Sequence, residues 1–169
     1  MGSSGSKEEP KNHPLGPVRH ASKSGVFIQL LEFPGMYGYR DARLKSSKDT
    51  YSQALKCTLG GYTFAIQCRF LLDNDGDVTV AVVVFLQAGE WDNNVEWPFA
   101  KKVWVGITHP RDHEKDIWHR VYLTKPESTK RPEASRWNFG SYNREVKFRQ
   151  LQHNGFIHDG KLYVNIELH

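Results

Sequence analysis

Apolar and polar positions alternate along most of the chain that follows residue 24. Between residues 63 and 73, one parity holds only apolar side chains, while the other carries Gln67, Arg69 and Asp73. The same alternation recurs at residues 102–107, 145–149 and 162–168. A period of two is typical of a β-strand with one buried face, so each segment is predicted to be such a strand.

The most apolar stretch, residues 80–86, is apolar at both parities and predicts a central strand that is packed on both sides. It follows Asp73-Asn-Asp-Gly-Asp77, whose Asp-Gly step is a strong signal for a hairpin. Gly155 and the pair Asp159-Gly160 predict further turns, the second of which leads into the last strand.

Helical periodicity is weak throughout. No amphipathic helix of three turns is expected, although residues 47–55 could form one or two turns with Ser46 or Ser47 as the cap. Short strands separated by turns, without long helices, favour two packed antiparallel sheets. The predicted fold class is therefore all-β, an antiparallel β-sandwich of about seven to eight strands.

The chain of 169 residues is about one domain long. Residues 1–6 are typical of an expression-vector remnant, and residues 7–23 contain prolines without any periodicity. We therefore expect residues 1–23 to be a tag remnant and a disordered lead or linker, and residues 24–169 to form the domain. Two cysteines are too few for a secreted disulfide framework, which favours a reducing, cytoplasmic setting.

Several classes of function lack support in the sequence. No apolar run reaches the roughly 18 residues of a membrane helix, so no membrane insertion is expected. No nucleophile elbow, P-loop or Cys/His nucleophile context occurs, so we expect no catalytic residue, no cofactor and no enzyme. Nucleic-acid binding is disfavoured because the net charge is only +4 and no signature of a nucleic-acid-binding fold is visible.

Two patterns superficially resemble metal sites. Asp73, Asp75 and Asp77 match the start of a calcium loop, but valines stand where the turn glycine and the bidentate glutamate belong. His109 and His113 have the spacing of a helical pair of ligands, but Pro110 disfavours a helix and no third ligand is evident. A plain hairpin and no metal site are therefore expected.

An ordered set of motifs resembles the TRAF-C domain, a branch of the MATH (meprin and TRAF homology) family. The matching stretches are Gly25-Val-Phe-Ile28, Ser52 to Tyr62, Gly89-Glu-Trp-Asp92 with Trp97-Pro-Phe99, and Gly155 to Gly160 with the strand after it. The chain departs from the family at Gln29, where the family usually has tryptophan. Residues 7–23 also lack the heptads of the trimerising stalk of TRAF proteins, so a homotrimer is expected only in a full-length context.

This resemblance implies a module that binds short extended peptides of receptors or signalling proteins by adding a strand at a sheet edge. Family positions that contact ligand fall on Gln67, Arg69 and Asp73, while Ser128 and Thr129 are all that remains of the family's serine-rich loop. The edge that pairs with peptide is expected near Trp137–Tyr142. The group implied there is Phe139, Gly140, Ser141 and Tyr142.

The basic residues gather near that edge. Residues 125–149 contain seven Lys and Arg but only three Glu. Their net charge of +4 equals the net charge of the whole chain. We therefore expect an acidic peptide as ligand. The leading interpretation is a signalling adaptor, whose full-length form could carry a RING domain. The alternative is the substrate-recognition module of a ubiquitin ligase adaptor or deubiquitinase, and neighbouring domains would separate the two.

Overall fold

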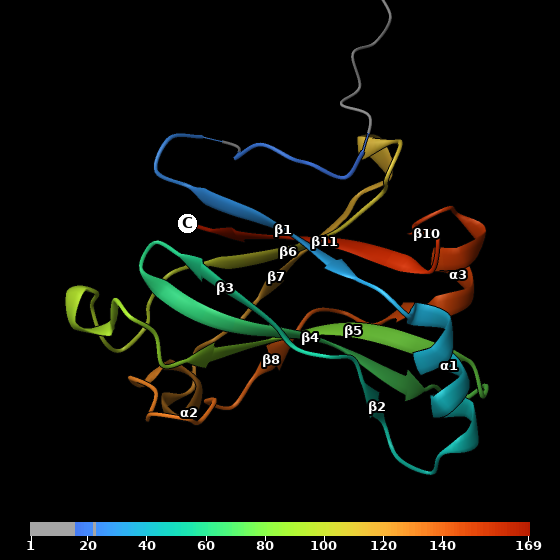
Figure 1. The fold of residues 1–169 in the computed structure, drawn as a ribbon, viewed down its shortest axis with the longest axis horizontal. Helices are drawn as coiled ribbons and strands as arrows, with labels where there is room; N and C mark the ends of the chain where they lie inside the picture. Colours follow the sequence, from blue (N-terminus) through green and yellow to red (C-terminus); the bar gives the residue numbers. More distant parts are fainter. Residues whose placement is uncertain (1–15, 22) are drawn as a thin grey trace, which may run out of the picture.

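The computed structural model describes residues 16–21 and 23–169, which form two stacked antiparallel sheets (Figure 1). The first sheet has five strands, ordered β1-β11-β6-β7 with β10 beside β11. Its strands are β1 (Phe27–Phe33), β6 (Val103–Thr108), β7 (Ile117–Val121), β10 (Ile157–His158) and β11 (Lys161–Leu168).

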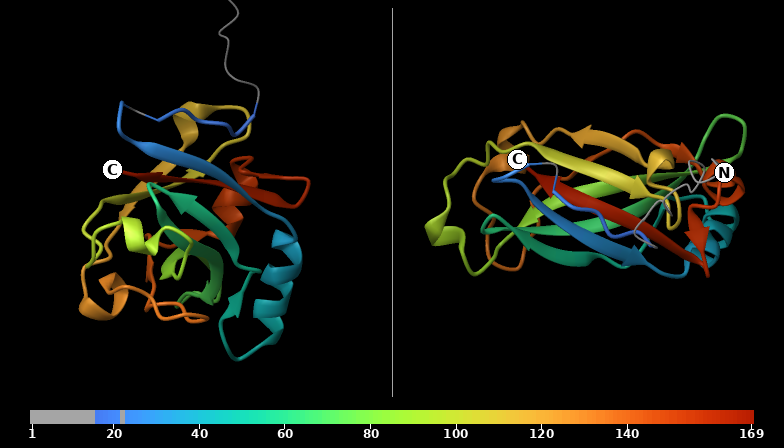
Figure 2. Two further views of the ribbon diagram at one scale, coloured as in Figure 1. Left: turned by 60° about the vertical axis from the view of Figure 1, so that its left-hand side comes forward. Right: turned by 90° about the horizontal axis from the view of Figure 1, so that it is seen from above.

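The second sheet has six strands, ordered β2-β4-β5-β8 with β3 beside β4 and β9 beside β5. Its strands are β2 (Thr50–Tyr51), β3 (Leu55–Leu59), β4 (Tyr62–Leu72), β5 (Val78–Gln87), β8 (Ser141–Tyr142) and β9 (Val146–Lys147). The helices α1 (Met36–Lys45) and α3 (Phe148–His153) lie at one end of the sandwich and α2 (Pro126–Thr129) at the other (Figures 1 and 2). Short 3-10 turns occupy Asp92–Asn94 and His113–Lys115.

The core fills the space between the sheets. Phe64, Ile66 and Phe70 of β4 have no exposed surface, and they face the apolar side of β6 and β11. Within the described residues, seven strands are five residues or longer, namely β1, β3, β4, β5, β6, β7 and β11. The predicted antiparallel β-sandwich is therefore confirmed.

β5 is buried along nearly its whole length, as its uninterrupted apolar run predicted. It pairs with β4 through the predicted hairpin, with Leu72 opposite Val78. The turn before β11 is also confirmed, because β10 and β11 are joined at Asp159-Gly160. Among the described residues, no helix is long and apolar enough to cross a membrane.

Local structure differs from the sequence prediction at two places. The helical turns expected at residues 47–55 are extended and include β2, while a ten-residue helix, α1, precedes them. Only Met36 and Arg43 of α1 are buried, so the helix carries no apolar stripe to reveal it. The strand expected at residues 145–149 shrinks to β9, because Phe148 begins α3 and packs into the core.

Part of the expected lead contacts the domain. Arg19 forms a forked ion pair with Asp116, with Nε–Oδ2 and Nη2–Oδ1 distances of 2.6 and 3.0 Å. Arg19 Nη2 also donates to the His109 carbonyl, and the Asn165 amide donates to the carbonyl of Pro17. Residues 16–21 therefore lie across the outer side of the first sheet (Figure 1).

Arg19→Ala is expected to lower the free energy of unfolding by about 3 kcal/mol, because it leaves the Asp116 carboxylate without its charged partner. The two side chains are only 11% and 5% exposed. Urea denaturation monitored by circular dichroism measures the change. Arg136→Ala serves as the control, because its pair with Glu133 is 79% and 66% exposed and should contribute under about 1 kcal/mol. Equal effects of the two changes would contradict the prediction.

Candidate functional site

One edge of the second sheet is open. Residues 137–147 run along β5 as its outer neighbour, through a bridge from Trp137 to Gln87 and the short strands β8 and β9. No further strand lies outside this segment in the part of the chain that the structure describes. The expected edge near Trp137–Tyr142 is therefore a real sheet edge in this fold.

The hydrogen bonds of Asn143 show which backbone groups of the segment point to the open edge. Its N–H donates to the Val82 carbonyl at 3.2 Å, and its side-chain Oδ1 accepts from the Val82 N–H at 2.7 Å. Asn143 thus faces β5, and successive residues of a strand direct their N–H groups to opposite edges. The N–H and C=O of Tyr142 are therefore directed to the open edge.

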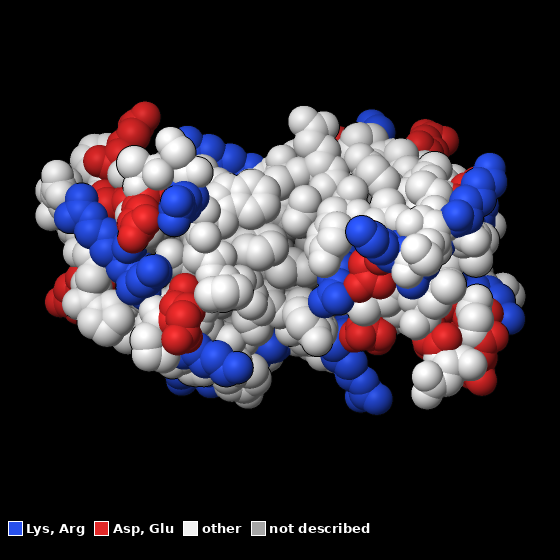
Figure 3. Space-filling view, turned by 90° about the horizontal axis from the view of Figure 1, so that it is seen from below, with Lys and Arg blue, Asp and Glu red and all other residues white. Residues whose placement is uncertain are grey.

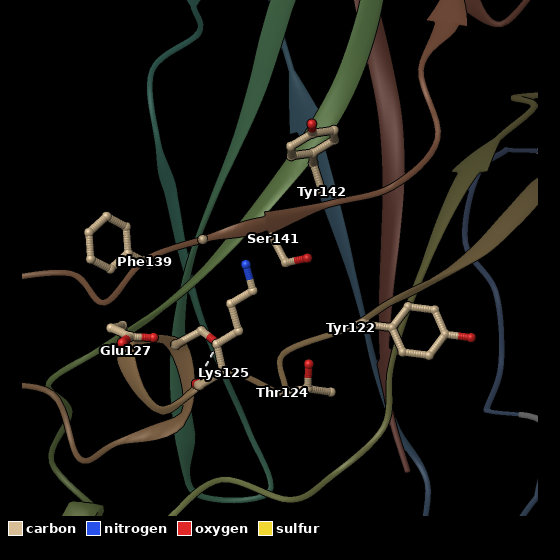
Figure 4. A pocket seen from close by; sticks show the side chains of 9 residues that line it. Tyr122, Thr124, Lys125, Glu127, Phe139, Ser141 and Tyr142 are labelled. Atoms are coloured by element: carbon tan, nitrogen blue, oxygen red, sulfur yellow. Dashed lines mark hydrogen bonds between the residues drawn. The ribbon is translucent and has the colours of Figure 1, made fainter.

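A pocket of about 520 Å³ lies beside this edge, between β8 and the chain that follows β7. The side chains of Lys125 and Ser141 point into it, while Tyr142 lies on the other side of β8 (Figure 4). The residues that line the pocket are Tyr122, Thr124, Lys125, Glu127, Ser128, Phe139, Gly140, Ser141 and Tyr142.

Gly140 is required by packing at this edge. A Cβ atom on Gly140 would lie 2.5 Å from Cε1 of Phe85, whose ring centroid lies 5.1 Å from that of Trp137 with the planes tilted by 39°. Phe139, next to Gly140, is 74% exposed. The glycine therefore lets the edge strand lie close on Phe85, while the neighbouring Phe139 side chain lies in solvent.

Arg69 connects β4 to the same edge across the outer face of the sheet. Its guanidinium lies 5.6 Å from the Tyr142 ring and 5.9 Å from the Tyr51 ring, and it bonds Asp49 at 2.6 Å. Burial alone would lower the pKa of Arg69, but the hydrogen bond and charge of Asp49 outweigh it and raise that pKa. Arg69 therefore presents a permanent charge between two aromatic rings.

Other predicted site residues have structural partners. The Gln67 side chain donates to the Ser52 carbonyl at 2.9 Å. The hydroxyls of Ser128 and Thr129 both donate to the Lys125 carbonyl, so they close the turn of α2. Of these three, only Ser128 also lines the pocket.

Asp73 stands apart from the edge, because it organises the β4–β5 turn. Its Oδ1 accepts from the N–H groups of Asp75 and Asp77, both at 2.9 Å. Desolvation would raise the pKa of Asp73, but these bonds and the charge of Lys147 outweigh it and lower that pKa. The three carboxylates lie within 4.8 Å of one another, and Lys147 contacts all of them. A lysine ammonium thus takes the place where a cation would bind.

The basic residues of the 125–149 stretch are divided by these contacts. Lys147 and Arg149 pair with Asp77 on the β4–β5 turn, and Arg136 pairs with Glu133. Seen from the side of the second sheet, charged side chains gather at both ends, and an uncharged strip crosses the middle (Figure 3). Lys125 is the cation that lines the pocket itself.

The remaining candidate chemistry is accounted for by structure. His109 Nδ1 lies within hydrogen-bond distance of the N–H groups of Arg111 and Asp112, and Nε2 lies 2.9 Å from the Asn154 carbonyl. Both ring nitrogens are therefore occupied. Cys57 and Cys68 are free and buried, and burial raises the pKa of each thiol to about 12, which suppresses the reactive thiolate.

The structure adds residues that alternation did not single out. Tyr122 and Thr124 reach the pocket from the chain after β7, and Tyr51 reaches Arg69 from β2. These residues lie in short loops and a two-residue strand, where no periodic pattern exists. Their exposure appears only in the structure, where Tyr51 and Tyr122 are 45% and 59% exposed, and large exposed apolar groups gather at binding surfaces.

The fold is an antiparallel β-sandwich with an open edge in the described part of its second sheet. The profile described as TRAF/meprin, MATH domain matches residues 47–165, so the chain belongs to the TRAF/meprin MATH domain family. The structure is similar to TRAF5 from Notothenia coriiceps, with a TM-score of 0.63, 16% identity, and coverage of 84% of this chain and 72% of that chain. A search of curated proteins found no match. Domains of this family generally mediate protein–protein interaction.

Asp73→Asn is expected to lower stability at pH 7 by removing the attraction to Lys147, while its amide oxygen still accepts the two backbone bonds. Because the folded-state pKa of Asp73 lies below its unfolded value, this contribution is present above the unfolded pKa and is lost as pH falls through the folded pKa. The difference in urea midpoint between the native chain and the variant should therefore shrink from pH 7 to about pH 2. Asp75→Asn, whose side chain is 79% exposed, is the control and should change little at either pH.

Proposed function

We propose that the domain binds a short extended segment of a partner protein by strand addition at β8. The observation that carries the proposal is the open backbone of Tyr142, which has a pocket on one side of its strand and the Arg69 and Tyr142 side chains on the other. A strand added there receives main-chain hydrogen bonds, which supply affinity without regard to sequence.

Side chains of an added strand alternate between two environments. Those on one parity would enter the pocket between Lys125 and Ser141, and those on the other would lie over Tyr142 and Arg69. The pocket side is shaped by Phe139 and Gly140, and the outer side by aromatic rings around a guanidinium. Two different environments at alternate positions are a basis for sequence selectivity.

The ligand is proposed to be acidic at the position that enters the pocket. Lys125 is exposed and has no ion pair among the described residues, whereas Arg69 is held by Asp49. The more distant basic residues Lys147 and Arg149 are neutralised by the β4–β5 turn. Lys125 lines the pocket itself, where Glu127 also lies, so in this proposal it contributes more to the attraction than the basic residues farther along the stretch.

At the level of the whole protein, we propose a signalling adaptor that recognises receptor tails or signalling proteins in the cytoplasm. The domain itself supplies binding and no catalysis in this proposal. Assembly into a trimer would depend on a segment outside the domain. A role in selecting substrates for a ubiquitin ligase or deubiquitinase would use the same edge.

Tyr142→Pro is expected to weaken binding of a peptide selected by display at least about tenfold more than Tyr142→Ala does. Both variants remove the phenol, but only proline also removes the outward N–H, which the fold itself does not use. Calorimetric titration gives the two affinities, and the melting temperatures show whether each variant is folded. Equal affinities of two folded variants would mean that the peptide does not pair with β8.

Lys125→Glu is expected to lower the affinity for the selected peptide at least about tenfold, because it reverses the charge of the side chain that points into the pocket. Lys101→Glu changes an exposed lysine just before β6 and is the matched control for net charge. Affinity for the native chain should also fall as salt rises from low to physiological concentration. A peptide that binds all three proteins alike would exclude an electrostatic role for Lys125.

A further inference from the structure

Residues 46–54, which join α1 to β3 and include β2, are fixed against β4. The Ser52 N–H donates to the Cys68 carbonyl, and the Ser52 hydroxyl accepts from the Cys68 N–H, both at 2.8 Å. The Gln67 side chain donates to the Ser52 carbonyl at 2.9 Å. In β2, Tyr51 stands directly opposite Arg69 in the register of the sheet. The segment therefore has a fixed position beside the outer side chains of β4.

Asp49 of this segment holds the Arg69 guanidinium from one side. Its Oδ2 accepts from Nε at 2.9 Å and from Nη2 at 2.6 Å, so two of the three guanidinium nitrogens bond to one carboxylate oxygen. Paired charge-assisted bonds of this kind restrict both the position and the orientation of the planar group. Nη1 is the nitrogen that Asp49 does not bond, and it is left for an acceptor of the ligand.

Arg43 of α1 holds Asp49 from the other side. Its Nε lies 3.5 Å from Asp49 Oδ1, and its Nη1 donates to the Ser46 carbonyl at 2.7 Å. The Arg43 side chain is only 9% exposed, so the Asp49 carboxylate lies between a buried cation and a partly exposed one. This arrangement ties Arg69 to the helix and gives the buried arginine of α1 a role.

Asp49 is the main restraint on Arg69. The Tyr51 and Tyr142 rings lie 5.9 and 5.6 Å from the guanidinium, and cation–π contacts at such partly exposed sites are weak. A long side chain that must be ordered by the ligand weakens association by about two- to tenfold. A guanidinium that is already ordered by the protein avoids this loss.

We propose that Asp49 is a positioning residue of the β8 site, which holds Arg69 in place for ligand side chains that lie over Tyr142. The inference rests on the proposed strand addition at β8. Asp49 acts through Arg69 and touches no ligand itself, while Arg43 keeps Asp49 in position. Selectivity on the outer side of the added strand then depends on the segment between α1 and β3.

A double-mutant cycle on the display-selected peptide tests the proposal. Arg69→Met removes the guanidinium but keeps a long unbranched side chain, and it should lower the affinity at least about fivefold. Asp49→Ala should lower the affinity about two- to tenfold in the native chain, and no further once Arg69→Met is present. The same loss on Asp49→Ala in both backgrounds would overturn the proposal, because Asp49 would then act without Arg69.

Controls separate positioning from stability. Asp41→Ala removes a carboxylate that is 53% exposed on α1, and it should leave the affinity unchanged. Asp49→Ala leaves the buried Arg43 without its carboxylate, so the melting temperature of every variant is measured. Asp49→Asn is the second variant, because its amide oxygen can still accept from Arg69 and should retain more of the affinity than alanine does.

NMR of the free protein observes the positioning directly. The Arg69 Nε–H should give a resolved signal in the native chain, because it is bonded to Asp49. In Asp49→Ala this signal should move to the position typical of exposed arginines. A signal that stays in place in the folded variant would overturn the proposal, since Arg69 would then be held by other groups.

The cycle and the Tyr142→Pro comparison can fail separately. A loss of affinity in Tyr142→Pro beyond that of Tyr142→Ala, without coupling between Asp49 and Arg69, would keep strand addition and overturn the positioning role. Coupling between Asp49 and Arg69, without an added loss in Tyr142→Pro, would reject pairing with β8 and still support Asp49 as the residue that positions Arg69.

Discussion

The need to pair both sides of β5 governs the second sheet and its edge. β5 is buried on both faces, so each of its N–H and C=O groups must have a partner inside the protein. β4 pairs one side continuously, whereas the other side is paired only by the broken segment 137–147. Where that segment bends, the Asn143 side chain replaces a backbone carbonyl for Val82. The segment that completes the pairing of β5 is therefore also the segment whose outer edge stays open in the described sheet.

The sandwich itself was predictable because burial of one face forces a period of two on long strands. The runs around Phe64 and Val164 display that period, and their register places both in the core. α1 was not predictable in this way, since a helix that buries only Met36 and Arg43 has no apolar stripe. β2, β8 and β9 have two residues each, too few for any period to appear.

The site was only partly predictable, for a related reason. Edge residues such as Gly140 and Tyr142 could be located through family resemblance, but the pocket also requires Tyr122 and Thr124, which follow a strand of the other sheet. The charge sum of residues 125–149 leaves out partners from other segments, because two of its basic residues, Lys147 and Arg149, pair with Asp77. Lys147 belongs electrostatically to the β4–β5 turn, and that turn lies 70 positions earlier in the sequence at Asp77.

If a partner strand is added at β8 as proposed, the shortness of β8 limits how strongly one domain can hold it. A two-residue strand followed by the irregular Asn143 offers few backbone bonds to an added chain, which also protects the edge against pairing with other copies. Under the proposed strand addition, each bound segment would dissociate readily, and durable attachment would require several domains to engage several segments at once. Because linked sites raise the effective concentration of one another, such an edge responds to the clustering of its partner more steeply than to the partner's amount.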